Sequence, residues 1–127
     1  MSKVIVNTKN APAPIGPYSQ AVKANGMVYV SGQICINPQT GELVNSDIVS
    51  ETHQVMKNIK AILEEAGSSF EKVVKSGIFV KDLNNFVTIN GVYGEYFNAD
   101  TAPARETVEV SRLPKDVNVE ISCIALL

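Results

Sequence analysis

Two segments near the C-terminus each carry a charged side chain that could act on a small carboxylate. Residues 105–110 and 117–126 alternate as β-strands do, with Arg105 and Thr107 on one face of the first and Glu120 on the second. Two neighbouring strands would let Arg105 and Glu120 face one cleft. Arginine binds a carboxylate through two parallel hydrogen bonds, and a glutamate can hold or deprotonate water. The spacing alone favours an ordinary cross-strand charge pair.

Three further side chains could take part in chemistry, and each also has a structural explanation. Residues 11–17 contain three prolines, which exclude a helix or central strand and predict a stiff loop that places Tyr18. Such a tyrosine is usually a packing residue with its hydroxyl at the surface. Asn90 fits a hydrogen bond within its own helix, and His53, the only histidine, fits a solvated position.

Length and charge exclude several classes of protein. At 127 residues the chain is expected to form a single domain over 1–127, since domains commonly have about 100–150 residues. Its net charge is −2, and Lys72, Lys75 and Lys81 form the nearest approach to a basic stripe, which argues against nucleic-acid binding. No segment approaches the roughly 20 apolar residues of a membrane span, and none resembles a secretory signal. We therefore expect a cytoplasmic protein.

The cysteines and glycines argue against the common cofactor sites. Cys35 and Cys123 are far apart in the chain and lack metal-ligand spacing, so we expect two buried free thiols. A histidine-based metal site or a Ser-His-Asp triad within one copy would depend wholly on His53. The chain has no glycine-rich phosphate-binding motif, which argues against a nucleotide cofactor.

The order of predicted elements is typical of an α+β fold. Strands are predicted over 3–6, over 21–25 and 27–31 on either side of Asn25-Gly26, and over 73–81, 105–110 and 117–126, where side chains alternate. Helices are predicted where apolar residues recur every three or four positions, over 46–66 and 84–98. This order predicts one twisted sheet with two helices covering one face. The other face of the sheet must also be covered, and in a chain this short the simplest cover is a second copy, so we expect self-association.

Local signals mark where the elements begin and end. Asn25-Gly26 is typical of a tight hairpin turn. Ser46 or Asp47 is expected to cap the long helix, and Gly67 to end it.

Two details of the later elements depend on packing. Alternation over 73–81 predicts that Val74, Ser76, Ile78 and Val80 share one side of that strand. Gly91 and Gly94 each weaken the second helix by roughly 1 kcal/mol relative to alanine. Close packing against a neighbour would explain them.

Several separated segments resemble, in order, the motifs of one protein family. These segments are 15–21 (IGPYSQA), 31–34 (SGQI), 79–84 (FVKDLN), 103–105 (PAR), 108–110 (VEV), 112–115 (RLPK) and 119–121 (VEI). Together they resemble the Rid family of imine and enamine deaminases, also called the YjgF family, and within it the RidA branch. The resemblance covers essentially the whole chain, and the pattern from Pro-Ala-Arg to Glu120 is specific.

The resemblance implies a chorismate-mutase-like fold in a homotrimer, with active sites in the clefts between subunits. It also implies hydrolysis of 2-iminobutanoate and 2-iminopropanoate, which pyridoxal-phosphate dehydratases release, to 2-oxo acids and ammonia. Such an enzyme protects against imine damage. An imine carbon is already electrophilic, so orientation, anion binding and an activated water are sufficient, and neither metal nor cofactor is expected.

Carried over by position, the resemblance assigns seven residues to the site. Arg105 would bind the substrate carboxylate and Glu120 would position water. The pocket would be lined by Tyr18, Ser31, Gly32, Asn90 and Thr107. Backbone groups near Gly32 and Thr107 are further candidates for substrate binding.

Three departures from the family pattern concern the substrate range. Thr107 stands where many relatives have cysteine or serine, so a hydroxyl remains but thiol chemistry is absent. Glu106 replaces a small residue, although alternation directs it away from the Arg105 face. The segment before Pro103 is about two residues short, and Ala102 stands where an aromatic residue is common. These changes leave the preferred imine side chain open.

Two other functions stay open at this point. Some relatives have been described as translation inhibitors or ribonucleases, but the pI of about 5.4 and the missing basic groove argue against an RNA-directed role. A non-catalytic sensor of a small carboxylate would also need Arg105. The sequence therefore separates RNA from small molecules better than it separates an enzyme from a sensor.

Overall fold

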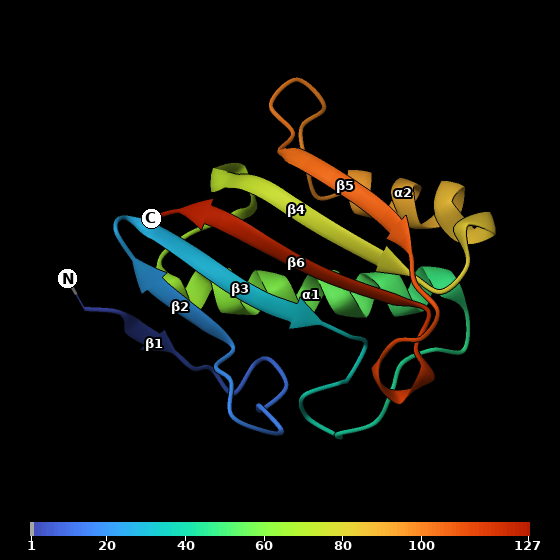
Figure 1. The fold of residues 1–127 in the computed structure, drawn as a ribbon, viewed down its shortest axis with the longest axis horizontal. Coiled ribbons are helices and arrows are strands. Elements are labelled where there is room, and N and C mark those ends of the chain that lie inside the picture. The colour runs from blue at the N-terminus through green and yellow to red at the C-terminus, as the bar shows by residue number, and fades with distance from the viewer. Residues whose placement is uncertain (1) are drawn as a thin grey trace.

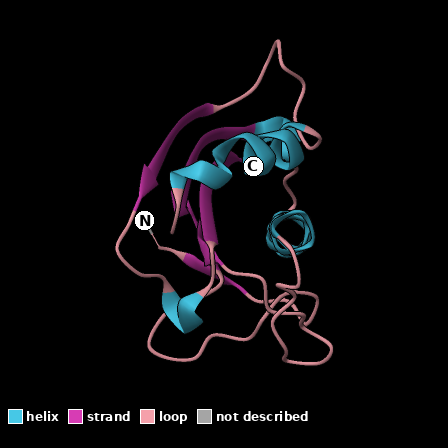
Figure 2. Ribbon diagram, turned by 90° about the vertical axis from the view of Figure 1, so that its right-hand side faces the viewer, coloured by secondary structure: helices cyan, strands magenta, loops and turns pink. Residues whose placement is uncertain are grey.

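A mixed sheet carries two α-helices on one face (Figures 1 and 2) in the computed structural model, which describes residues 2–127. The strands are β1 (Val4–Val6), β2 (Ala21–Ala24), β3 (Met27–Gln33), β4 (Val73–Val80), β5 (Ala104–Glu109) and β6 (Val119–Leu126). The helices are α1 (Ile48–Ala66) and α2 (Phe86–Gly94). Short 3₁₀ turns occupy Phe70–Lys72, Leu83–Asn85 and Pro114–Asp116. The α+β prediction is confirmed.

The strand order shows that β5 and β6 are not neighbours. The order is β1-β2-β3-β6-β4-β5, and only β4 and β5 are parallel. Because α2 connects β4 to β5, the chain crosses over and returns parallel to β4, which leaves the other edge of β4 for β6. The expectation that Arg105 and Glu120 lie on neighbouring strands is therefore wrong.

Helix α1 supplies most of the helical side of the core. Asp47 caps its first turn by accepting a hydrogen bond from the Ser50 amide, and Gly67 ends it with a φ of 84°. Its buried apolar side chains pack on the inward residues of the sheet; they are Val55, Met56, Ile59, Ile62, Leu63 and Ala66. Each such side chain contributes about 1.5–3 kcal/mol on burial. Both predicted helix ends are thereby confirmed.

The hairpin prediction also holds. Asn25 and Gly26 have φ angles of 53° and 76°, the left-handed geometry that a two-residue turn between β2 and β3 requires.

Two sequence-based details of the later elements are wrong. The pairing of β4 with β6 shifts register between Val73 and Lys75, so Val73 is buried (5% exposed) and Val74 is not (39%). Helix α2 ends at Gly94, well before residue 98. Tyr96 and Phe97 follow in a turn, where each ring centroid lies 5.3 Å from that of Phe70. The apolar spacing of Tyr96 and Phe97, which predicted a longer helix, results from their packing on Phe70.

The packing explanation for the two glycines of α2 is not supported within the chain. Apart from the backbone of α2 itself and the adjoining residues, no atom of residues 2–127 lies within 4 Å of a Cβ placed at Gly91 or Gly94. We therefore expect Gly91→Ala to raise the free energy of unfolding by about 1 kcal/mol and Tm by about 4 °C, because alanine loses less backbone entropy in a helix. Thermal denaturation followed by circular dichroism measures this. A lower Tm would show that Gly91 packs against a second copy of the chain.

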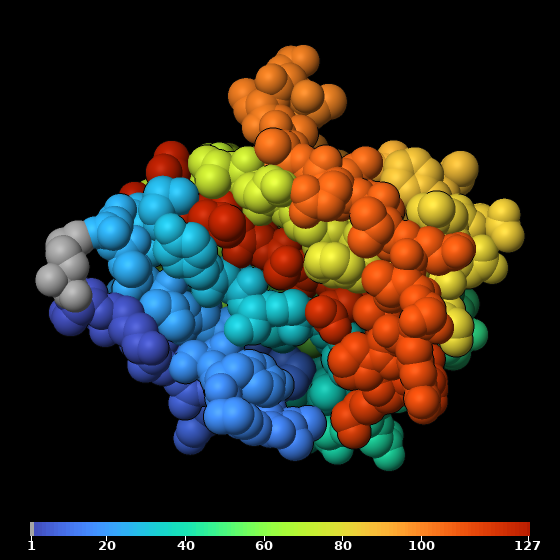
Figure 3. All heavy atoms as spheres, in the orientation of Figure 1, coloured from blue at the N-terminus to red at the C-terminus, as the bar shows by residue number. Residues whose placement is uncertain are grey.

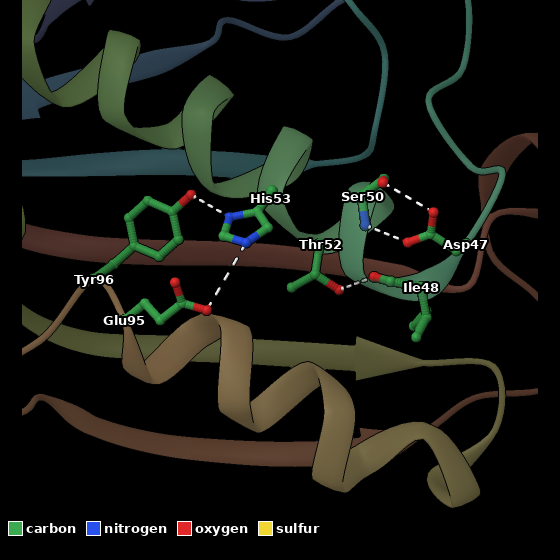
Figure 4. A network of polar contacts seen from close by, with 7 residues as sticks. All are labelled: Asp47, Ile48, Ser50, Thr52, His53, Glu95 and Tyr96. Carbon is green, nitrogen blue, oxygen red and sulfur yellow. Dashed lines mark hydrogen bonds and ion pairs between the residues drawn. The ribbon is translucent and has the colours of Figure 1, made fainter.

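His53 connects α1 to the segment that follows α2 (Figure 4). Its Nδ1 lies 2.7 Å from the Tyr96 hydroxyl oxygen, and its Nε2 lies 3.8 Å from Oε2 of Glu95. The side chain is 31% exposed, so the expected solvated position holds only in part, and the imidazole also forms part of the contact between the two helical segments.

No helix within residues 2–127 combines the length and the apolar character needed to cross a lipid bilayer.

Candidate functional site

A cavity of about 490 Å³ opens beside the C-terminal end of β3. On the side of the molecule shown in Figure 3, the blue proline-rich loop and the orange-red turn at Pro114–Asp116 border this region. The lining residues are mostly apolar, and include Pro12, Ala13, Ile15, Ile34, Ile36 and Pro114. Four of the seven predicted site residues join them: Tyr18, Ser31, Gly32 and Glu120.

The Glu120 carboxylate lies directly over Gly32. A β-bulge between Val30 and Gln33 places Gly32 beside β6. A Cβ at Gly32 would overlap Oε2 of Glu120 and come within 2.8 Å of its Cδ. Burial in this apolar setting raises the pKa of Glu120 above the usual carboxyl value. A carboxylate of this kind is a stronger base than one in bulk water.

We expect Gly32→Ala to displace the Glu120 carboxylate without unfolding the protein. The new methyl group would overlap Oε2 and lie 2.8 Å from Cδ of Glu120, and the side chain of Glu120 is flexible enough to turn away. If Glu120 acts on the substrate, activity should fall by about 10²-fold, while Tm changes by only a few degrees. Kinetics and thermal denaturation of the same sample test this. Full activity would show that the position of Glu120 is unimportant.

Buried hydrogen bonds hold the loop that bears Tyr18. The Gln20 side chain is 1% exposed; it accepts a hydrogen bond from the Thr8 amide and donates to the carbonyls of Thr8, Ala11 and Pro12. Tyr18 is 52% exposed, and its hydroxyl accepts a 3.4 Å hydrogen bond from the Ile15 amide. Sequence reasoning missed Gln20. Its signal was a polar residue between a proline-rich loop and a buried strand.

Ser31 joins this wall of the cavity to the same loop. Its Oγ donates a 2.6 Å hydrogen bond to the Ser19 carbonyl.

Arg105 belongs to a second cluster, where β5 contacts α2. Its Nη1 donates a 2.7 Å hydrogen bond to Oδ1 of Asn90, so Asn90 bonds outside its own helix. The guanidinium carbon lies 5.1 Å from the ring centroid of Tyr93 and 5.7 Å from that of Phe86. Residues 86, 90 and 93 recur at helical spacing, a pattern from which the support of Arg105 could have been predicted but was not. The guanidinium is thus held in place yet exposed.

Thr107 lies on the same face of β5 as Arg105. Its hydroxyl oxygen is buried and has no hydrogen-bond partner among residues 2–127. Buried hydroxyls are normally paired, so this one is available to a ligand or a second copy. Glu106 points to the other face, where its carboxylate lies 2.9 Å from Nζ of Lys75, as the alternation predicted. Lys75 is therefore neutralised and contributes little to a basic stripe.

The two clusters lie on opposite faces of the sheet. Arg105 pairs in register with Ser76, a buried residue of the helical face, which the Tyr93 hydroxyl contacts. Glu120 alternates with the buried Val119 and Ile121, so it lies on the uncovered face. Within one copy, described over residues 2–127, the predicted site is divided into a Glu120 half and an Arg105 half. The prediction that Arg105 and Glu120 face one cleft of the same chain is therefore wrong, and so is the alternative that they form a cross-strand charge pair.

The remaining chemistry-bearing side chains form no further centre. Cys35 and Cys123 are buried and free, as expected. Burial raises their pKa values to about 11 and about 12, so both are neutral thiols at pH 7. Among residues 2–127, no group of three or more His, Cys, Asp or Glu side chains is arranged to hold a metal ion.

Comparison with known proteins gives consistent matches along the chain. Residues 8–127 match the family model described as Endoribonuclease L-PSP. A RutC family protein of Pyrococcus abyssi is 55% identical, over 98% of each chain. The 2-iminobutanoate/2-iminopropanoate deaminase of Escherichia coli K12 is 51% identical, over 99% of this chain and 98% of that protein.

A solved structure confirms the fold that the resemblance implied. The crystal structure of a conserved Rid family protein of unknown function from Yersinia pestis superimposes with a TM-score of 0.96. It is 52% identical, over 99% of this chain and all of that one. The chain therefore belongs to the Rid (YjgF) family, whose members share the Endoribonuclease L-PSP domain.

Proposed function

We propose that this protein hydrolyses 2-imino acids, in particular 2-iminobutanoate and 2-iminopropanoate, at sites formed between the subunits of a homotrimer. The observation that supports this is the division of the site into two complementary halves. One half presents the exposed guanidinium of Arg105, and the other presents the Glu120 carboxylate in an apolar cavity. A 2-imino acid needs both groups at once, and a second copy is the simplest source of the missing half.

The reaction requires only binding, orientation and proton transfer. Arg105 holds the substrate carboxylate, and the free Thr107 hydroxyl donates a hydrogen bond to it. With the imine nitrogen protonated, Glu120 takes a proton from water as the water oxygen bonds to the imine carbon and the π electrons move to nitrogen, which gives a neutral carbinolamine. Glu120 returns that proton to the nitrogen. The C–N bond then breaks to release ammonia, while the carbinolamine hydroxyl gives its proton to the Glu120 carboxylate and becomes the carbonyl of the 2-oxo acid. No group on this path needs a metal or cofactor.

The walls of the cavity fit an aliphatic substrate side chain. Pro12, Ile15, Ile34 and Ile36 present apolar surface beside Glu120. At about 490 Å³ the cavity has room for more than the methyl or ethyl group of the two named imines. Ala102 lies outside these lining residues, so its effect on substrate range would come through a second copy.

A coupled assay tests the proposal. An amino-acid oxidase generates the 2-imino acid, and semicarbazide traps what has not been hydrolysed. The wild-type protein should suppress semicarbazone formation in proportion to its concentration. Absence of any effect on several aliphatic imines would exclude the deaminase and leave a carboxylate sensor. Light scattering gives the oligomeric state in parallel, and a clean monomer would exclude the inter-subunit site.

The match to a family described as Endoribonuclease L-PSP makes an RNA-directed role the second candidate. Binding to RNA rests mainly on phosphate neutralisation, and here the net charge is −2 while Lys75 is paired with Glu106. Titration of purified, nuclease-free protein with single-stranded RNA at two salt concentrations decides the question. Steep salt-dependent binding and cleavage would favour the RNA-directed role.

A further inference from the structure

A buried carboxylate on α1 lies at the start of the strand that bears Glu120. Glu51 is 0% exposed, although it lies one turn from the N-terminus of the helix. It accepts three hydrogen bonds, all from two adjacent residues. The donors are the Asn118 amide at 2.7 Å, Nδ2 of Asn118 at 2.8 Å and the Val119 amide at 3.2 Å.

These contacts give the backbone amides at the start of β6 hydrogen-bond acceptors that the neighbouring strands do not provide. Asn118 lies just before β6 and Val119 is its first residue, so the end of the strand depends on Glu51 for its orientation. A buried carboxylate is costly unless it is fully hydrogen-bonded, and an uncharged core residue would have been cheaper for stability alone. The arrangement therefore favours positional accuracy at this end of β6.

Glu120 is the next residue along. Its carboxylate lies over Gly32, where even one added methyl group would overlap it, so a small rotation at the start of β6 would move it off the bulge of β3. We propose that Glu51 is a positioning residue that holds the Glu120 carboxylate in the cavity through Asn118 and Val119. The kinetic part of this inference rests on the proposed hydrolase function, while its structural part does not.

Four variants separate positioning from general stability. Glu51→Ala removes all three hydrogen bonds, and Asn118→Ala removes only the side-chain one. Glu51→Gln keeps an oxygen for the two amides and can pair with a reoriented Asn118 side chain. Thr52→Val is the matched control, because Thr52 is equally buried on α1 but its hydroxyl donates to the Ile48 carbonyl within the helix.

The first readout is the titration of the Glu120 carboxyl carbon by NMR, which requires no activity. In Glu51→Ala the pKa of Glu120 should fall towards the usual carboxyl value, because a displaced side chain gains water. Asn118→Ala should shift it in the same direction by less, while Glu51→Gln and Thr52→Val leave it unchanged.

The second readout is kinetic. Glu51→Ala should lower kcat at least tenfold with little change in KM, since Arg105 is untouched, and Glu51→Gln should restore most of it.

The outcomes distinguish the two proposals. Shifted Glu120 titration with no wild-type hydrolysis would refute the hydrolase and retain the positioning role. An unchanged Glu120 titration in folded Glu51→Ala would overturn the positioning role whatever the activity. If Glu51→Ala does not fold, an unchanged titration in Asn118→Ala overturns it instead, because loss of the Nδ2 hydrogen bond alone is expected to shift the pKa of Glu120. Equal losses in Thr52→Val would reduce Glu51 to a stabilising residue.

Discussion

Arg105→Ala is expected to lower kcat/KM for 2-imino acids by about 30-fold to several thousand-fold while the protein stays folded. Loss of one partner of a desolvated charge pair typically costs about 2–5 kcal/mol. The fold should tolerate the change, because the guanidinium is exposed in the chain and its contacts are one hydrogen bond to Asn90 and two aromatic rings. The semicarbazide assay measures the loss, and circular dichroism confirms the fold.

Arg105→Lys is the matched variant. Lysine keeps the positive charge but cannot form two parallel hydrogen bonds to a carboxylate, so activity between those of alanine and wild type is expected. Wild-type activity in Arg105→Ala would exclude this side chain as the carboxylate-binding group. Equal activity of the lysine variant and wild type would show that charge suffices.

Most elements of the fold could be predicted because their signals are local. Asn25-Gly26 specifies its turn through backbone conformation, and Asp47 and Gly67 mark the ends of α1 by capping. The end of α2 was missed for the converse reason. Tyr96 and Phe97 continue the apolar spacing, but they pack on Phe70, a residue remote in sequence.

The order of the strands, and the face of the sheet on which each side chain lies, could not be predicted from local patterns. Alternation shows which residues share a face within one strand, but it does not say which face of the sheet that is. Arg105 and Glu120 both alternate correctly, but they lie on opposite faces because Arg105 pairs with Ser76 of β4 and Glu120 with Phe79, and these two positions lie on opposite sides of that strand. The resemblance supplied the site residues, and the structure shows how they divide. The supports Gln20 and Glu51 were missed because their hydrogen bonds join segments far apart in the chain.

The largest effect is expected for Glu120→Gln. Glutamine has nearly the same shape over Gly32 but cannot accept a proton, so kcat should fall by about 10²–10⁴-fold. In Glu120→Gln the Arg105 half of the site is intact, and in Arg105→Ala the Glu120 half is intact. Each variant alone is therefore expected to be almost inactive for a different reason.

Mixing these two variants tests whether each site draws its halves from two subunits. After joint unfolding and refolding at equal amounts, about a quarter of the clefts in a randomly assembled cyclic trimer would combine an intact Arg105 with an intact Glu120. Activity should then recover to about a quarter of the wild-type value. If both groups served one site within the same subunit, no recovery would occur.

The double variant mixed with wild-type protein provides the control. Half of the subunits are then intact, so a site within one subunit predicts about half of full activity, whereas a site between subunits again predicts about a quarter. Activities near a quarter of the wild-type value in both mixtures would establish the shared site. A site within one subunit predicts no activity in the first mixture and about half in the second. Losses during refolding would lower both activities, but they would not make these two values equal. The uncovered face of the sheet, with Glu120 on it, and the surface around Arg105 and Asn90 beside α2 would then be the two surfaces that meet.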